Sequence, residues 1–258
     1  MSEYIFTLGK ATETEKYRMI DDLVPIMIEQ VYNKNKDKYI HKYMIHVNGD
    51  TYGLFSDKYV YCSTKFLVEK FKNFKMDRFF YYKGNITTYL ESETSNNIPL
   101  DNETFRLLAA LSDEKLEMFE SDSKIGIYLI NSYTGMSKIL IGNYLKIQFA
   151  KEKSLFVKFA LTDFSTSHIG GLLHKIENNI LELDYITIDR INRISMEDAV
   201  KILQKYLTKK EYKKYESIKN EVGQLKPIHM LIFVAYNKIN FMRENMLLNE
   251  FTQMLKTI

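Results

Sequence analysis

Lysines crowd one stretch near the carboxyl end of the chain. Residues 201–226 hold eight lysines and three glutamates, which gives a local charge of +5. Four of these lysines are spaced so that, on a helix, they lie along one strip of the surface; they are Lys209, Lys210, Lys213 and Lys214, called the lysine strip below. Tyr212 stands among them and offers a ring that can stack on a base. The pattern predicts a site for an anionic partner, whether nucleic acid or an acidic protein face.

Two physical effects destabilise such a strip unless something neutralises it. Like charges four residues apart on a helix repel each other. Thr208, with Glu211 three residues later, predicts the start of a helix, and positive charge at that end opposes the helix dipole. Glu211 and Glu216 lie within reach of the lysines. The alternative interpretation is therefore an ordinary solvated helix face that these glutamates screen.

A second basic patch occurs in the first third of the chain. Its cationic residues are Lys65, Lys70, Lys72, Lys75 and Arg78. Phenylalanines alternate with them, at Phe66, Phe71 and Phe74. Aromatic and basic residues together are what single-stranded nucleic-acid platforms use. Buried phenylalanines flanked by exposed lysines are the alternative. Arg78 is the only arginine in either patch, which disfavours bidentate recognition of bases or phosphates.

Histidine and cysteine, the residues most often used as metal ligands and nucleophiles, are few in this sequence. The five histidines are His41, His46, His168, His174 and His229. The first two are five residues apart on a predicted strand and so point to opposite faces, and His168 and His174 lack the spacing that brings two ligands together on a helix. The single cysteine, Cys62, follows a predicted strand, and we expect it to be buried and unreactive. We therefore assign no metal site, no cofactor and no catalytic residue.

Acidic residues leave one enzymatic alternative open. Glu182 and Asp184 share one face of a predicted strand, and Asp122 with Lys124 enters another. Carboxylates and a lysine converging at a sheet edge are what a metal-dependent nuclease needs. The glycine-bearing loop 163–171 also precedes a predicted helix, whose free amide groups could bind an anion.

The composition indicates a chain able to build its own core. Of 258 residues, 45% are hydrophobic and 14% aromatic. The net charge of +3 is too small for the whole molecule to act as a polycation, so any basic site must be local. The longest strongly apolar run, residues 230–236, is far shorter than the roughly 20 residues that span a bilayer. We expect a cytoplasmic protein without a membrane segment.

Helix and strand signals predict an α+β fold with two antiparallel β-meanders, intervening helices and a helical C-terminal segment. In the first part the predicted elements are a strand over 4–8, a helix over 12–32 that Pro25 interrupts, strands over 43–47 and 52–55 around an Asn48-Gly49 turn, a strand over 59–61, a helix over 64–73 and strands over 79–82 and 86–90. We expect these strands, all before Ser92, to form one sheet.

The second part repeats this style. Residues 91–99 are polar and read as a linker, and 102–120 read as one broken or two short helices. The elements that follow are strands over 125–130, 139–149 and 155–161, a short helix over 169–176, a strand over 180–188, and helices capped at Ser195 and Thr208, with a final apolar stripe after Pro227. The predicted domains are 1–98 and 99–258, with a helical subdomain over 195–258.

Function follows from charge segregation, since no catalytic motif is present. An acidic run over 113–122 and the basic region 201–226 carry opposite charge. We expect a binding or scaffold protein that acts through charged surfaces on a protein partner or on itself, in a low-GC bacterium, phage or mobile element. Nucleic-acid binding, in an antiviral defence or counter-defence system, is one alternative, and a metal-dependent nuclease is the other.

Overall fold

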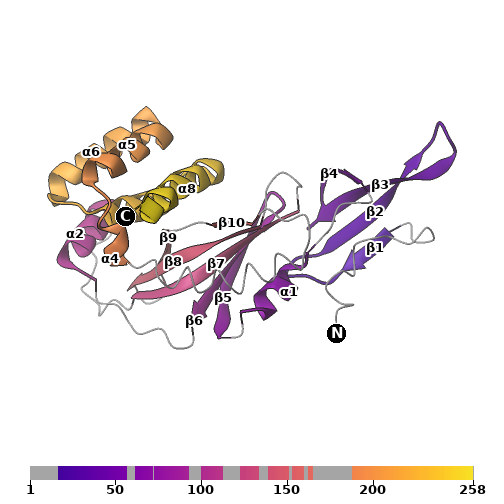
Figure 1. Ribbon diagram of the computed structural model, residues 1–258, viewed down its shortest axis with the longest axis horizontal. Helices are drawn as coiled ribbons and strands as arrows, with labels where there is room; N and C mark the ends of the chain where they lie inside the picture. Colours follow the sequence, from indigo (N-terminus) through magenta and orange to yellow (C-terminus); the bar gives the residue numbers. More distant parts are fainter. Residues whose placement is uncertain are drawn as a thin grey trace. The chain divides into compact units, whose positions relative to one another are not determined.

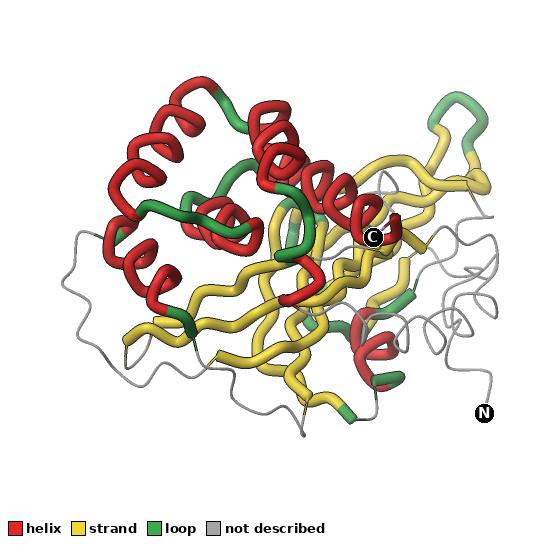
Figure 2. The backbone as a smooth tube through the Cα atoms, turned by 60° about the vertical axis from the view of Figure 1, so that its left-hand side comes forward, coloured by secondary structure: helices red, strands yellow, loops and turns green. Residues whose placement is uncertain are grey.

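The computed structural model describes residues 17–56, 62–71, 73–92, 100–112, 123–133, 139–150, 153–159, 162–164 and 188–257. Two antiparallel sheets and several helices confirm the predicted α+β class (Figures 1 and 2). The chain divides into two compact units, one of residues 1–90 and 129–140, the other of residues 91–128 and 141–258. The predicted boundary between residues 98 and 99 lies outside the described residues and stays a prediction. None of the described helices has both the length and the apolar content needed to cross a bilayer.

The first sheet has four strands in sequence order: β1 (Tyr17–Ile20), β2 (Ile26–Asn33), β3 (Lys38–Val47) and β4 (Asp50–Ser56). The predicted hairpin around Asn48-Gly49 is confirmed, because both residues have positive φ and Val47 pairs with Asp50. Alternate residues of β2 and β3, including Ile26, Ile45 and Val47, are buried in the core of this unit. This is the two-residue period expected of a sheet with one covered face.

The helix predicted over residues 12–32 is wrong where the chain is described. Residues 17–20 and 26–33 are strands, and Pro25 stands directly before β2 instead of kinking a helix. Local capping and spacing signals suggested the helix, but Ile26 and Ile28 pair with Val47 and Ile45 on β3. Long-range pairing therefore overrode a weak local preference.

The second sheet has six strands. β5 (Phe74–Tyr82) and β6 (Asn85–Ser92) form the predicted strand pair, and β7 (Ser123–Ser132), β8 (Ile139–Ala150), β9 (Lys153–Lys158) and β10 (Thr162–Phe164) follow. Its order is β10-β8-β7-β6-β5, with β9 also paired to β8. The expectation that β5 and β6 belong to the first sheet is thus wrong. Ser92 and Glu91, predicted as linker, lie at the end of β6.

A buried polar network anchors the short helix α1 (Thr64–Glu69). The helix predicted over 64–73 is confirmed as far as Glu69, and its last part is not helical where it is described. The Asp22 carboxylate accepts hydrogen bonds from the backbone amides of Thr64 (3.0 Å), Lys65 (3.2 Å) and Leu23 (2.7 Å), and from the Tyr133 hydroxyl. Asn131 donates to the Cys62 carbonyl at 2.7 Å. Cys62 is buried as predicted, and burial, followed by the Asp22 charge, raises the pKa of its thiol to about 12.

The helices of the second unit gather around one apolar helix. They are α2 (Asn102–Leu111), α4 (Ile188–Ile191), α5 (Met196–Tyr206), α6 (Lys209–Val222), α7 (Pro227–Tyr236) and α8 (Phe241–Thr257). Nearly every residue of α7 is buried, because α2, α4, α5 and β9 all pack against it. Ile188 begins α4, so the prediction that it ends a strand over 180–188 is wrong at this residue. The rest of that predicted strand lies outside the described residues.

Candidate functional site

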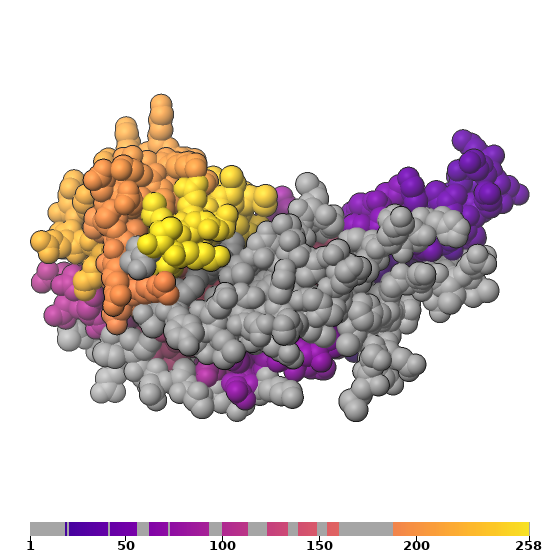
Figure 3. Space-filling model, viewed as in Figure 1, coloured from indigo at the N-terminus to yellow at the C-terminus, as the bar shows by residue number. Residues whose placement is uncertain are grey.

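Helix α6 presents the lysine strip to solvent. The predicted cap is confirmed: the Thr208 hydroxyl accepts from the Glu211 amide, and the Glu211 carboxylate accepts from the Thr208 amide at 2.6 Å. Tyr215, Ile218 and Val222 are buried on the inner face of the helix. Because these residues fix the rotation of α6, the four lysines of the strip point outward and are all exposed. Figure 3 shows the orange residues of helices α5 and α6 at the surface of the protein.

Glu211 does not screen the strip, because Arg243 of α8 engages it. The two guanidinium nitrogens of Arg243 lie 2.7 and 3.1 Å from the two oxygens of the Glu211 carboxylate. Hydrogen bonds from Arg243 lower the pKa of Glu211 to about 2. The carboxylate is therefore ionised, but its charge is balanced on the inner side of α6. Glu216 is exposed and forms no ion pair within the described part of the chain.

Three of the four other lysines in the region 201–226 pair with acids. Lys201 pairs with Glu197 at 2.7 Å, and Lys205 pairs with Glu250. Lys226 pairs with Asp101 at 2.5 Å. In the strip, Lys214 donates to the neutral Asn237 side chain at 2.8 Å, and no described acid pairs with any of the four. Lys219, in the last turn of α6, also has no acidic partner among the described residues, so four of the five unpaired lysines of this region belong to the strip.

Tyr212 is placed beside the strip but does not offer a free ring. It is only partly exposed, and its hydroxyl accepts a hydrogen bond from Gln204 at 2.9 Å. Its ring centroid lies 6.0 Å from that of Tyr215. These contacts hold the ring against the helix surface, which weakens its predicted role in stacking.

Two methionines are exposed on α8, the helix that packs beside α6. Met242 and Met246 lie one turn apart on α8, and 62% and 52% of their surfaces are exposed. Arg243, next to Met242, contacts both Glu211 and the Tyr206 carbonyl, so the first turn of α8 lies beside the first turn of α6. Exposed methionines are adaptable and are enriched at protein–protein interfaces. No local sequence pattern predicts that α6 and α8 lie side by side here, because the contact joins segments that are distant in the chain.

The second basic patch is distributed over two elements. Lys65 and Lys70 lie on or directly after α1, where Lys65 pairs with Asp21 at 2.6 Å and Lys70 covers the Phe66 ring at 4.5 Å. Lys75 and Arg78 are exposed on β5, three residues apart, so they point to opposite faces of the strand. Phe71 is buried, and Lys72 lies outside the described residues. The role of this patch in binding stays a prediction.

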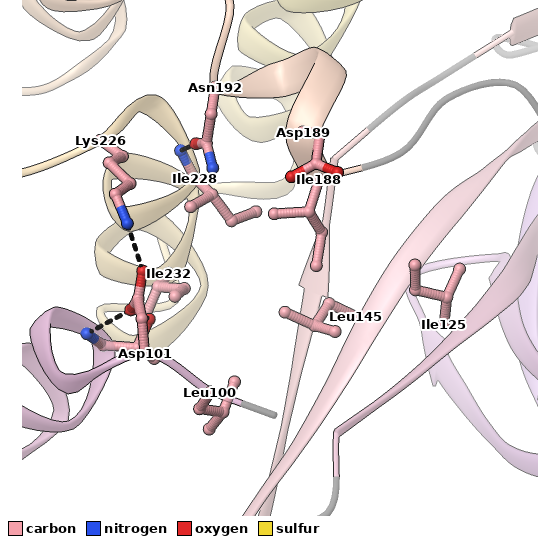
Figure 4. A pocket seen from close by; sticks show the side chains of 11 residues that line it. Leu100, Asp101, Ile125, Leu145, Ile188, Asp189, Asn192, Lys226, Ile228 and Ile232 are labelled. Atoms are coloured by element: carbon pink, nitrogen blue, oxygen red, sulfur yellow. Dashed lines mark hydrogen bonds and ion pairs between the residues drawn. The ribbon is translucent and has the colours of Figure 1, made fainter. Parts of the chain in front are cut away.

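A cavity of about 370 Å³ opens where α2, α4 and α7 meet β7 and β8. Figure 4 shows apolar side chains around it, with the Lys226–Asp101 ion pair and the polar ends of Asp189 and Asn192 at its margin. Its size and apolar lining are typical of a small-ligand site. Such a site also needs polar groups that are free to orient a ligand.

Asp101, Lys226 and Asn192, at the cavity margin, already form hydrogen bonds or ion pairs within the protein. Asp101 caps α2 through the Thr104 amide at 2.9 Å and accepts from the Thr104 hydroxyl at 2.6 Å. His229, fully buried, accepts from the Lys226 amide at 2.9 Å and lies 3.1 Å from the Thr104 hydroxyl. Burial lowers the pKa of His229, which favours the neutral ring. Because this network joins the first turns of α2 and α7, we assign it a structural role.

The other candidate residues, the histidines and the carboxylates, do not form a site within the described residues. No three histidine, cysteine, aspartate or glutamate side chains among the described residues could hold a metal ion. His46 is bound to Glu29 and Thr51 on the first sheet. Glu182, Asp184, Asp122, His168, His174 and residues 165–171 lie outside the described residues, as does the His41 side chain.

Comparisons with known proteins identify no relative. No family model, curated protein or solved structure matches the chain. Function must therefore be argued from the geometry of this molecule alone.

Proposed function

We propose that this chain is a binding or scaffold protein whose lysine strip docks on an acidic face of a protein partner. One observation carries the proposal: four exposed lysines share the first half of α6, while the nearest glutamate on the helix is held by Arg243 on the other side. Repulsion along the strip and its position near the helix start both disfavour this arrangement in the isolated protein. An acidic partner would relieve both effects.

A protein partner is favoured over nucleic acid at this site for two reasons. The strip lacks arginine, and Tyr212, the aromatic ring on the same turns of α6, is held by Gln204 and Tyr215. The strip therefore has no residue suited to bidentate phosphate contacts or to stacking on a base. Exposed Met242 and Met246 on the adjoining helix instead supply the apolar contact that protein interfaces combine with charge.

The test is calorimetric titration of the purified protein with poly-L-glutamate at low and moderate salt. Changing Lys209, Lys210, Lys213 and Lys214 together to glutamine should weaken binding at least about ten-fold and flatten its salt dependence. The matched control changes four exposed lysines outside the strip to glutamine, at Lys42, Lys83, Lys219 and Lys256, and so removes the same charge.

The control should bind within about two-fold of the unchanged protein, since net charge alone gives only weak, long-range attraction. Equal losses in both variants would show that the strip has no special role. Tighter binding of duplex DNA than of poly-L-glutamate, lost on the same four changes, would reassign the strip to nucleic acid.

A further inference from the structure

The hairpin formed by β2 and β3 extends beyond its own sheet as a two-stranded arm (Figure 1). Among the described residues, β1 pairs with β2 over Ile26–Glu29, and β4 pairs with β3 over Lys42–Val47. Within this described part of the chain, no third strand pairs with the arm, residues 30–41. An isolated two-stranded ribbon is marginally stable, so its tip must be held by local contacts.

Local hydrogen bonds fix the tip of this arm. The Asn33 carbonyl accepts from the Lys36 amide at 3.2 Å, and the Asn33 side chain accepts from the Asn35 amide at 3.0 Å. Asp37 adopts a positive φ of 48° and accepts a hydrogen bond from the Tyr32 hydroxyl. The loop is thus a defined turn, and a ligand bound there would not have to order it.

Two aromatic rings stand at this tip. Tyr32 and Tyr39 are cross-strand partners, with ring centroids 5.1 Å apart and an interplanar angle of 68°. They remain 43% and 38% exposed. A register shift in the β2–β3 pairing separates Tyr39 from the buried residues Tyr43, Ile45 and Val47 of β3. The two tyrosines thus form an exposed aromatic surface on the arm, beyond the core of the sheet.

Positive charge surrounds these rings. Lys34, Lys36 and Lys38 are all exposed in or beside the turn, and no described acid forms an ion pair with them. Asp37, the one acid among them, is engaged by Tyr32. Rigid exposed aromatic rings within a ring of lysines match the chemistry of unpaired bases joined by phosphates. A purely acidic protein face would use the lysines but not the ring faces.

We propose that the tip of the β2–β3 arm binds single-stranded nucleic acid, with bases stacked on Tyr32 and Tyr39 and phosphates bound by Lys34, Lys36 and Lys38. The site belongs to the first unit and does not depend on the lysine strip of α6. The absence of arginine from the arm predicts little sequence preference.

The experiment is fluorescence anisotropy of a labelled oligothymidine of about 12 nucleotides titrated with the full chain. Changing Tyr32 and Tyr39 together to isoleucine should weaken binding at least about ten-fold, while changing both to phenylalanine should restore it to within about two-fold. Changing the three lysines to glutamine should also weaken binding and reduce the salt slope by about two. The quadruple glutamine variant of the α6 strip should bind as the unchanged protein does.

Four outcomes would overturn the proposal. Failure of the unchanged protein to bind the oligonucleotide, or normal binding by the isoleucine pair, would remove the stacking role. Equal affinity for a duplex of the same length would exclude recognition of unpaired bases. Tighter binding of poly-L-glutamate, lost in the arm lysine variant, would assign the arm to an acidic protein. The variant with both tyrosines changed to phenylalanine is the control. It shows whether a loss of binding in the isoleucine variant comes from the missing aromatic rings or from a disturbed fold.

Discussion

Changing Asp22 to asparagine is expected to lower the free energy of unfolding by about 3 kcal/mol, because it disrupts hydrogen bonds to a buried carboxylate. Both oxygens of Asp22 accept from backbone amides, and the Tyr133 hydroxyl donates to one of them. Asparagine keeps one acceptor and turns an NH₂ group toward amides that are themselves donors. Urea unfolding followed by far-ultraviolet circular dichroism measures the effect.

The neighbouring Asp21 supplies the control. Its side chain is 89% exposed and pairs with Lys65 at 2.6 Å, so Asp21→Asn should change stability by less than about 0.5 kcal/mol. If Asp22→Asn were as mild as Asp21→Asn, the network around α1 would be a surface feature and not an anchor of this unit.

Changing Glu244 to glutamine should destabilise the protein by about 3 kcal/mol, because it removes the carboxylate that faces a buried ammonium group. Lys158 on β9 is only 7% exposed at its side chain, and its Nζ lies 2.9 Å from Glu244 on α8. The Tyr128 and Phe241 rings lie 5.4 and 5.7 Å from the same nitrogen. This ion pair therefore joins the sheet to the last helix in a setting with little water.

A double-mutant cycle separates the pair from its surroundings. Adding Lys158→Met to Glu244→Gln should recover much of the lost stability, since the buried charge is then gone as well. The exposed pair of Glu197 and Lys201 is the control, and Glu197→Gln should have almost no effect. A double variant less stable than Glu244→Gln alone would contradict this view of the Lys158 environment.

Signals confined to a few neighbouring residues predicted local structure well. Thr208 with Glu211, and Ser195 with Asp198, gave both helix starts. Asn48-Gly49 gave the hairpin turn, because few other residue pairs tolerate the positive φ angles it needs. Each of these rests on one hydrogen bond or one backbone conformation within four residues.

Features that depend on distant segments could not be predicted in this way. The strand β2 was predicted to be part of a helix from local capping and spacing signals, and only its pairing with β3 decides the outcome. The same holds for β5 and β6, whose sheet is chosen by pairing with β7.

The candidate site shows the same division. The exposure of Lys209 and Lys213 follows from the apolar spacing of Tyr215, Ile218 and Val222 on the same helix. The ion pair between Glu211 and Arg243 could not be predicted from the spacing on that helix. Arg243 is 32 residues away in the chain and reaches Glu211 only through the packing of α8. That contact decides whether the strip is screened.

The most direct test of the account is the stability of the quadruple glutamine variant of the lysine strip, measured by urea unfolding at low and at high salt. Lysine and glutamine have similar helix propensities, so the difference reports charge. If the strip holds uncompensated charge, the variant should be more stable than the unchanged protein by about 1 kcal/mol at low salt, and the gain should vanish at high salt. A variant less stable at low salt would mean that the protein already neutralises these lysines, which contradicts the proposed docking surface.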